Sequence, residues 1–207
     1  MPASGYLGSI QKLHAVFTLR RREEVLARNI AALLPLDTQS VLDIGCGDGV
    51  IASLVAEARP GLNVEGVEVL DRESCRIPYR LFDGRRLPFP DASFDAVSFV
   101  DVLHHTDNIE ALLAEAARVS RRYLIIKDHV WSTRLDFAVL RFMDWVGNRS
   151  YGVRLVYNYQ RRRRWLELFE HSGLNVTAWN SALGLYPIPF SFVFEHGKHF
   201  LALLTKR

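Results

Sequence analysis

Apolar residues recur along this chain with two different periods, and the alternation between them predicts a fold class. Helical spacing in some segments gives way to short, continuous apolar runs in others. We predict helices at residues 9–34, 50–59 and 108–119, with Asp107 as the N-cap of the last, and strands at residues 40–44, 63–70, 79–82, 94–100 and 123–127. Because strands that alternate with helices form a parallel sheet covered on both faces, the sequence predicts a doubly wound α/β domain.

The last part of the chain follows another pattern. After a predicted helix that ends at Gly173, residues 174–183 and 199–205 have the pattern of strands, without a helical stretch between them. A long hairpin would join them, so we expect the last two strands to be antiparallel. With 207 residues and no low-complexity linker, residues 1–207 are expected to form a single domain.

Composition and charge narrow the class of protein only a little. The chain is 49% hydrophobic and 24% charged, as in ordinary globular proteins, and its net charge is +3. Much of the positive excess lies in the run Arg161–Arg164, which is a weak footprint for nucleic acid, so no nucleic-acid partner is expected. Two cysteines fit a reducing compartment, and no uncharged apolar run reaches the about 18 residues of a membrane span. We therefore expect a cytoplasmic protein without a membrane span.

A glycine-rich turn follows the first predicted strand, in the stretch SVLDIGCGDGV. The apolar run stops at Asp43, and glycines occupy positions 45, 47 and 49. In an open parallel sheet, ligands bind at the carboxyl ends of the strands, where glycine lets the backbone come close to them. Glu68 ends the second predicted strand about 20 residues later, where a carboxylate can accept hydrogen bonds from a ribose diol. The sequence therefore predicts a ligand that contains a ribose, such as an adenosine.

The spacing of the glycines distinguishes between two adenosine cofactors. Dinucleotide-binding turns have the pattern G-x-G-x-x-G, whereas this chain has G-x-G-x-G preceded by Asp43. An acid before the glycines suits an amino-bearing or cationic ligand better than a pyrophosphate. S-adenosylmethionine carries both an amino acid tail and a sulfonium, so we predict it in preference to a nicotinamide cofactor.

These motifs resemble a known family. VLDIGCGDG resembles motif I of the class I S-adenosylmethionine-dependent methyltransferases, and residues 81–105 (LFDGRRLPFPDASFDAVSFVDVLHH) resemble their small-molecule branch, methyltransferase type 11. The resemblance implies a Rossmann-like sheet of seven strands in the order 3-2-1-4-5-7-6, the last strand antiparallel. It also implies a set of cofactor-binding residues, with Glu68 on the ribose and Asp83 on the adenine: Asp43, Gly45, Cys46, Gly47, Glu68, Asp83, Gly84 and Val100. One departure is that residues 69–82 leave room for only a very short second helix, or none.

Candidate catalytic residues follow the fourth predicted strand, in VDVLHH. They are Asp101, His104 and His105, of which we regard His105 as the first to test because an imidazole titrates near working pH. Both histidines could instead cap or pack the junction. The pair Asp128-His129 follows the fifth strand and could form a carboxylate–imidazole contact or simply begin a loop. Histidines are scattered without recognised ligand spacing, so no metal site is predicted.

Two segments are expected to cover the acceptor pocket by family resemblance, the N-terminal helical region 9–34 and the insertion 130–160. The first half of the insertion has a helical period that ends at Gly147-Asn148 and places four apolar residues on one stripe: Leu135, Val139, Phe142 and Val146. Five aromatic residues could line an apolar pocket or pack in the core: Phe142, Trp145, Tyr151, Tyr157 and Tyr159. The run Arg161, Arg162, Arg163 and Arg164 could bind an anionic acceptor or pair with surface acids.

The predicted function is S-adenosylmethionine-dependent methyl transfer by in-line displacement to a small-molecule acceptor, for which an anionic or an aromatic compound is considered. Enzymes that methylate amino groups of nucleic-acid bases carry an Asn/Asp-Pro-Pro-aromatic signature after the fourth strand, and this chain has DVLHH at that place. The difference argues against a base amino group as the acceptor. The alternatives are an RNA or protein methyltransferase and a non-catalytic regulatory partner that binds S-adenosylmethionine.

Overall fold

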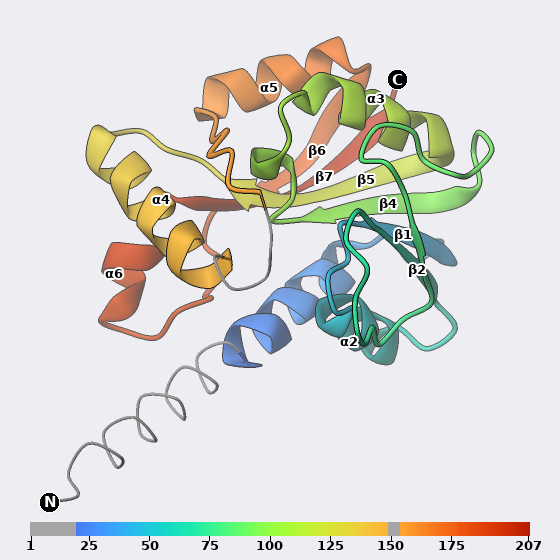
Figure 1. Ribbon diagram of the computed structural model, residues 1–207, viewed down its shortest axis with the longest axis horizontal. Coiled ribbons are helices and arrows are strands. Elements are labelled where there is room, and N and C mark those ends of the chain that lie inside the picture. The colour runs from blue at the N-terminus through green and yellow to red at the C-terminus, as the bar shows by residue number, and fades with distance from the viewer. Residues whose placement is uncertain (1–19, 149–153) are drawn as a thin grey trace, which may run out of the picture.

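Seven strands form one sheet in the order β3-β2-β1-β4-β5-β7-β6 in the computed structural model, which describes residues 20–148 and 154–207 (Figure 1). The strands are β1 Ser40–Ile44, β2 Asn63–Glu68, β3 Tyr79–Leu81, β4 Phe94–Val100, β5 Ser120–His129, β6 Leu174–Asn180 and β7 His199–Lys206. β1 to β5 pair in parallel, and β7 runs antiparallel to both β5 and β6. The predicted strand order and the antiparallel seventh strand are confirmed.

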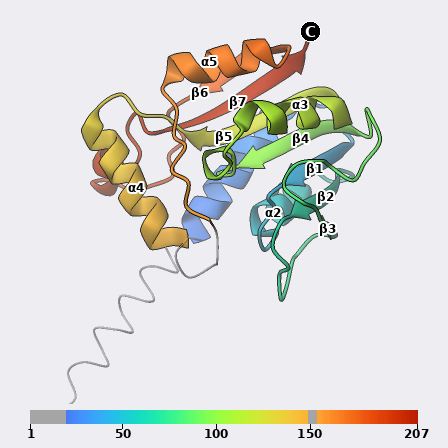
Figure 2. The same cartoon turned by 45° about the horizontal axis from the view of Figure 1, so that its top comes forward.

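Helices cover both faces of the sheet, as Figures 1 and 2 show. They are a helix over the described residues 20–33, α2 Val50–Ala58, α3 Ile109–Val119, α4 Arg134–Asn148, α5 Arg162–His171 and α6 Phe190–Phe194. α3 and α5 pack on one face, in a core that includes Leu113 and Trp165. The N-terminal helix and α2 pack on the other face through residues such as Leu26 and Val55. The doubly wound architecture is therefore confirmed, and residues 9–19 of the predicted first helix lie outside the described residues.

Two local predictions of secondary structure were wrong and a third is confirmed. The connection between β6 and β7 contains the short helix α6, so the prediction of no helical stretch there was wrong. The N-cap of α3 is Asn108, whose side chain accepts a hydrogen bond from the Ala111 N–H at 2.9 Å, and not Asp107. Asp107 instead pairs with Arg154 at 2.5 Å. Residues 69–78 contain no helix, as the short spacing between Glu68 and Asp83 indicated.

α4 lies beyond the carboxyl end of β5 and next to α6 (Figures 1 and 2), and it presents its apolar stripe outward. Leu135, Phe142 and Val146 are exposed, and only Val139 of the predicted stripe is half-buried. The inward face instead carries Leu140 and the buried Asp144. The predicted stripe is therefore largely exposed, and the expectation that this segment covers the acceptor pocket stays a prediction.

The register of the central strands brings the predicted site together. Asp43 on β1 lies opposite Gly66 on β2 and Ser98 on β4. Since β1, β2, β4 and β5 are parallel, their carboxyl ends meet at one edge of the sheet. The glycine turn, Glu68, the single turn Leu103–His105 and Asp128-His129 all lie at that edge.

Candidate active site

The glycine turn bends tightly and leaves part of its backbone open. Gly45 and Gly47 have φ values of 71° and 58°, in the left-handed region that favours glycine. A Cβ on Gly45 would lie 2.6 Å from Cγ2 of Val102, so the loop after β4 closes against the turn there. A Cβ on Gly47 would have no described neighbour within 4 Å. The turn therefore touches the β4 loop on one side and offers bare backbone to a ligand on the other.

Glu68 is buried at the end of β2 and is surrounded by donors. Its carboxylate accepts the backbone N–H of Gly47 at 2.9 Å and of Val69 at 2.8 Å, and it pairs with Nη2 of Arg72 at 3.1 Å. Nε of Arg72 is buried without a hydrogen-bond partner. Buried hydrogen-bond donors without a partner are rare in native proteins. The Nε group of Arg72 beside Glu68 is therefore suited to bind a polar group of a ligand.

The other predicted cofactor contacts lie around this centre. Asp43 is buried beneath the turn, where it accepts the Ser98 hydroxyl at 2.7 Å, and burial raises its pKa to about 7. Asp83 is exposed after β3, and the backbone N–H groups of Arg85 and Arg86 donate to its Oδ1 at 2.8 Å, which lowers its pKa. Three further half-buried residues lie at the same strand ends: Cys46 after β1, Gly84 after β3, and Val100, which is the last residue of β4.

Asp101 follows β4 with a φ of 58°, a conformation that costs free energy for a residue with a side chain. Its carboxylate bonds to Nζ of Lys127 and to the guanidinium of Arg22 from the N-terminal helix. Burial opposes ionisation of Asp101, but the charges of Lys127 and Arg22 outweigh it and hold the pKa well below its usual range. Burial also lowers the pKa of Lys127, to about 8. Asp101 is thus an ionised carboxylate held between two cations, and its predicted catalytic role stays a prediction.

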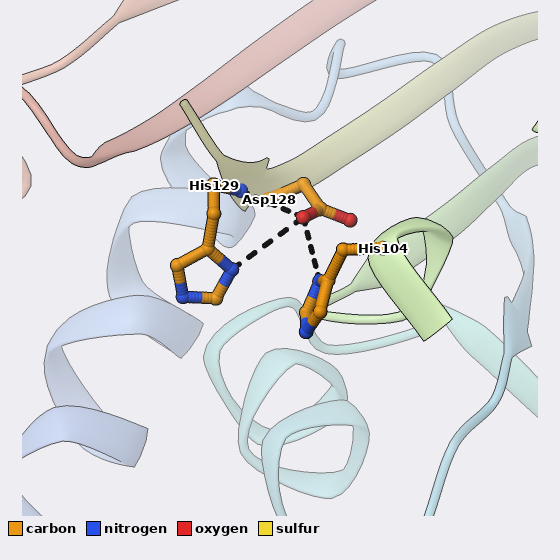
Figure 3. Close-up of side chains that lie close together, drawn as sticks. All are labelled: His104, Asp128 and His129. Carbon is orange, nitrogen blue, oxygen red and sulfur yellow. Dashed lines mark hydrogen bonds and ion pairs between the residues drawn. The ribbon is translucent and has the colours of Figure 1, made fainter. Parts of the chain in front are cut away.

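His104 forms the centre of a buried imidazole–carboxylate network (Figure 3). Its Nδ1 lies 2.7 Å from Oδ1 of Asp128, and its Nε2 lies 3.8 Å from Oδ1 of Asp144. Burial opposes a charge on His104, but Asp128 outweighs it and raises the pKa to about 10, while His104 in turn helps to hold the pKa of Asp128 low against burial. His104 is 1% exposed. It is therefore an enclosed cation that holds other groups in place.

His105 differs from its neighbour in both exposure and charge. Its Nδ1 lies 3.2 Å from the carbonyl oxygen of Arg154, which can only accept, so Nδ1 carries the proton and Nε2 has the lone pair. Burial and the adjacent His104 cation lower its pKa, so His105 is neutral near pH 7. Nε2 lies 3.5 Å from Oδ1 of Asp144, whose Oδ2 accepts the Tyr159 hydroxyl at 3.0 Å. This arrangement suits a general base whose charged form would be stabilised by Asp144.

His129 and His199 complete the network on β5 and β7. In Figure 3, His129 points toward the carboxylate of Asp128 from the side opposite His104. Its Nδ1 lies 3.5 Å from Asp128 and 3.4 Å from Asp101, too far for well-formed hydrogen bonds, and it is buried without a hydrogen-bond partner. Burial lowers its pKa to about 4. His199 accepts from Lys127 at 3.3 Å through Nδ1, because its Nε2 donates to the Phe194 carbonyl at 2.8 Å.

Two trios in this network have the side chains of a metal site, His104–Asp128–His129 and His104–His105–Asp144. The 2.7 Å separation of His104 and Asp128 is that of a hydrogen bond between ion-pair partners. Lys127 and Arg22 already place two positive charges on the adjacent Asp101. The negative charges of Asp128 and Asp101 are thus balanced by positively charged side chains of the protein. The expectation of no metal site stays a prediction.

Some predicted residues do not reach this network. Arg163 and Arg164 pair with the acids Glu167 and Glu110, and Arg161 and Arg162 lie over the rings of Trp131 and Trp179 at 4.1 and 5.3 Å. All four arginines are exposed, so none turns inward. Among the aromatic candidates Tyr159 is buried, Tyr157 is half-buried, Phe142 and Trp145 are exposed, and Tyr151 lies outside the described residues.

Sequence reasoning missed Arg22, Lys127, Asp144 and His199 as members of the network. A signal existed for Lys127, because a lysine that closes an apolar strand must find a partner. Arg22 and Asp144 have no such signal, since each is one charge among several on an amphipathic helix.

The fold and the site define a class of protein. It is a doubly wound α/β domain in which a glycine-rich turn and a buried carboxylate at the ends of the first two strands lie at the same sheet edge as a cluster of histidines. The methyltransferase-domain family matches residues 18–178. The chain is 41% identical over 91 residues to a demethylmenaquinone methyltransferase of Tropheryma whipplei, an alignment that covers 39% of this chain and 37% of that protein. It is 34% identical over 112 residues to a fatty-acid O-methyltransferase of Mycolicibacterium smegmatis, covering 50% and 41%. The chain thus spans about two fifths of the length of the curated relatives it matches.

Structural comparison supports the same class. A S-adenosylmethionine-dependent methyltransferase of Thermotoga maritima superposes with a TM-score of 0.66 at 20% identity and covers 96% of both chains, which shows a shared fold. The chain belongs to the methyltransferase-domain family, and it shares the fold of that S-adenosylmethionine-dependent methyltransferase.

Proposed function

We propose that this protein transfers the methyl group of S-adenosylmethionine to an oxygen atom of a lipophilic small molecule. The observation that carries the proposal is the neutral His105, held next to Asp144 at the same sheet edge as the open glycine turn. Methyl transfer to a hydroxyl oxygen, such as that of a quinol, is aided by a group that removes the hydroxyl proton, and an imidazole with a lowered pKa is neutral near pH 7 and can accept it. A carboxylate acceptor is already ionised at this pH and needs no base.

The residues that would hold the cofactor are those around the glycine turn. The bare backbone at Gly47 and the orphaned Nε of Arg72 beside Glu68 fit a ligand with polar edges. Glu68 would hold the ribose, which requires Arg72 to turn away from the carboxylate, and Asp83 would hold the adenine through its exposed carboxylate. The bound cofactor supplies an electrophilic methyl carbon on a sulfonium.

The protein's part in the reaction is to orient the acceptor and to manage one proton. With the cofactor bound, the acceptor oxygen would form a bond to the methyl carbon while the bond from that carbon to sulfur broke, which would give S-adenosylhomocysteine as a neutral thioether. His105 Nε2 takes the proton of the acceptor hydroxyl, and Asp144 stabilises the imidazolium that forms. His104, held by Asp128, fixes Asp144 from the other side and acts as a positioning residue. Exclusion of water from the buried network strengthens each of these electrostatic contacts.

The acceptor class is inferred from relatives together with this chemistry. The names of two relatives mention lipophilic acceptors, demethylmenaquinone and a fatty acid, and the second name specifies transfer to oxygen. An oxygen nucleophile matches a site that offers a base rather than the wide basic groove of a polymer-binding enzyme.

A labelled-methyl assay tests the proposal directly. The purified chain is given S-adenosylmethionine with a radiolabelled methyl group and a matched set of acceptors: a long-chain fatty acid, its methyl ester, a short-chain acid and a lipophilic quinol. We expect label in the long-chain acid or the quinol and none in the ester, which lacks a free nucleophile. Label in added RNA or protein, or no transfer to any lipophilic oxygen, would refute the proposed acceptor class.

The cofactor assignment makes a separate prediction. We expect Glu68→Gln to weaken binding of S-adenosylmethionine and of S-adenosylhomocysteine by about 100-fold, because each well-placed hydrogen bond between a charged group and its partner contributes roughly 1.5–3 kcal/mol. Both ligands should lose affinity equally, since they share the ribose. Calorimetry measures the two affinities, and Glu65→Gln on the same strand is the matched control, because Glu65 pairs with the exposed Arg80 at 2.7 Å. Unchanged affinity in Glu68→Gln would place the ribose elsewhere.

A further inference from the structure

α4 carries a continuous apolar face that points away from the sheet. The exposed residues lie at helical spacing along it: Leu135 at 71%, Phe142 at 58%, Trp145 at 45% and Val146 at 52% exposure. Scattered exposed apolar residues are ordinary, but a stripe along a whole helix face, with two aromatic rings, exposes a contiguous patch.

The neighbouring segment around α6 extends this face. Residues 187–193 (PIPFSFV) are apolar except for Ser191, and four of them are strongly exposed: Ile188 at 78%, Phe190 at 48%, Phe192 at 67% and Val193 at 51%. α4 and α6 contact each other and lie side by side in Figure 1. We call the exposed apolar residues of α4 and of residues 187–193 the α4–α6 face.

The charges near the α4–α6 face are sorted by sign. α4 and residues 184–197 contain three carboxylates, and the structure turns each of them inward. Asp136 bonds to the backbone of Thr133 and pairs with Lys198 at 3.2 Å, Asp144 is buried in the active-site network, and Glu195 is buried and accepts the Tyr186 N–H at 3.1 Å. The two arginines of α4, Arg134 and Arg141, are exposed. An apolar surface whose exposed formal charges are arginines complements a surface that is apolar inside and anionic outside.

We propose that the α4–α6 face docks on an anionic lipid surface, which presents the lipophilic acceptor to the active site. The proposal rests on the proposed function for the identity of the acceptor, while docking itself is a property of this face alone. Aromatic and branched side chains would enter the boundary between headgroups and acyl chains, and Arg134 and Arg141 would meet lipid phosphates. The described residues contain no helix long and apolar enough to cross a bilayer, so contact through this part of the chain would be peripheral.

The position of α4 links docking to the reaction. The outward face of α4 carries Phe142 and Val146, and its inward face carries Asp144, which contacts His105 and Tyr159. Leu140 on the same inward face accepts the Tyr159 hydroxyl through its carbonyl at 3.2 Å. α4 therefore has an exposed apolar surface on one side and part of the candidate active site on the other. An acceptor that leaves the lipid next to α4 would be about one helix diameter away from this site.

Vesicle co-sedimentation of the full chain tests the docking. Vesicles of pure phosphatidylcholine are compared with vesicles that contain phosphatidylglycerol, at low and high salt. We expect binding to the anionic vesicles that weakens with salt, about 30-fold weaker binding in Arg134→Gln/Arg141→Gln, and at least about 100-fold weaker binding in Phe142→Gln/Phe192→Gln. Leu36→Gln is the matched control, because Leu36 is 93% exposed in the loop before β1, away from this face.

The outcomes separate docking from the proposed function. Calorimetry with S-adenosylmethionine on the same variants reports whether the cofactor site is intact, and circular dichroism reports the fold. If cofactor binding and methyl transfer in detergent persist while the wild-type chain ignores anionic vesicles, docking is refuted and the proposed function stands. If vesicles bind but no lipophilic acceptor is methylated, the proposed function fails alone. A dimer in sedimentation velocity that Phe142→Gln/Phe192→Gln dissociates would also overturn lipid docking, since a second copy would then cover the face.

Discussion

We expect Asp128→Asn to lower the free energy of unfolding by about 3–5 kcal/mol, because it removes one member of a buried ion pair and leaves the buried His104 cation with the more distant carboxylate of Asp144, 3.8 Å away. Asp128 is fully buried and accepts three bonds, from His104 Nδ1 at 2.7 Å, from the Leu103 N–H at 3.0 Å and from the His129 N–H at 2.7 Å. Asparagine keeps the volume, so the loss reports charge and hydrogen bonding and not a cavity. Urea unfolding followed by circular dichroism measures the effect.

The pH dependence of stability gives this prediction a second readout. The folded pKa of His104 is raised from 6.5 to about 10, so its contribution to stability is fully present below about pH 6.5 and is lost as the pH rises through about 10. The pKa of Asp128 is lowered, so its contribution is present above its ordinary value of 3.8 and is lost as the pH falls below it. Between about pH 6.5 and 10 we expect the wild-type free energy of unfolding to decline, and Asp128→Asn to abolish this part of the decline.

The matched control is Asp91→Asn. Asp91 pairs with Arg118 at 2.8 Å but its side chain is 80% exposed, so its loss should cost at most about 1 kcal/mol. A loss in Asp128→Asn no larger than that of the control, with an unchanged alkaline decline, would show that His104 and Asp128 do not form the ion pair described above.

The second large effect is on catalysis. We expect His105→Gln to lower kcat by about 100-fold or more with little change in the affinity for S-adenosylmethionine, because a positioned general base typically contributes 10²–10⁴-fold. Glutamine can keep a hydrogen bond to the Arg154 carbonyl but cannot take the acceptor's proton. Wild-type kcat/KM should fall on the acid side as His105 is protonated, at a pKa below 6.5, and the variant should lose this limb.

Two comparisons make the result for His105 specific. His171→Gln, at the exposed end of α5, should leave both kcat and the pH profile unchanged. Asp144→Asn should move the acid limb to still lower pH, because the carboxylate that stabilises the imidazolium is gone. If His105→Gln retains kcat within threefold of the wild type and keeps the acid limb, another group removes the proton, and Asp101 and His129 become the residues to test.

The catalytic hypothesis drawn from VDVLHH put His105 first and stays a prediction, and the sequence alone offered no physical reason to separate the two histidines. His104 and His105 are adjacent in sequence, yet one is an enclosed cation and the other a neutral, partly accessible imidazole. The difference arises from carboxylates that other elements bring, Asp128 from β5 and Asp144 from α4. A pKa depends on charges within a few ångströms, and the sequence does not place such neighbours.

The sequence by itself determined the sheet, the turn and the class of ligand. The strands at residues 40–44 and 94–100 have the same bounds in the sequence prediction and in the structure. The reason is that a short apolar run ending at a glycine or an acidic residue is typical of a buried strand in a parallel sheet. The glycines at 45 and 47 and the acid at 68 are local requirements of backbone conformation and of a strand end, so they can be found without coordinates.

Only the tertiary structure decided how charges meet and which face of α4 is covered. An apolar stripe predicts that one face of a helix packs against another surface, but the sequence does not say which surface. In α4 the buried Asp144 accepts the Tyr159 hydroxyl and faces inward, so the apolar stripe that includes Phe142 faces outward. Arg22, Asp101 and Lys127 come from three distant segments and meet because the N-terminal helix crosses near the ends of β4 and β5. Long-range electrostatic contacts of this kind have no local signature, since burial and neighbouring charge appear only when the chain has folded.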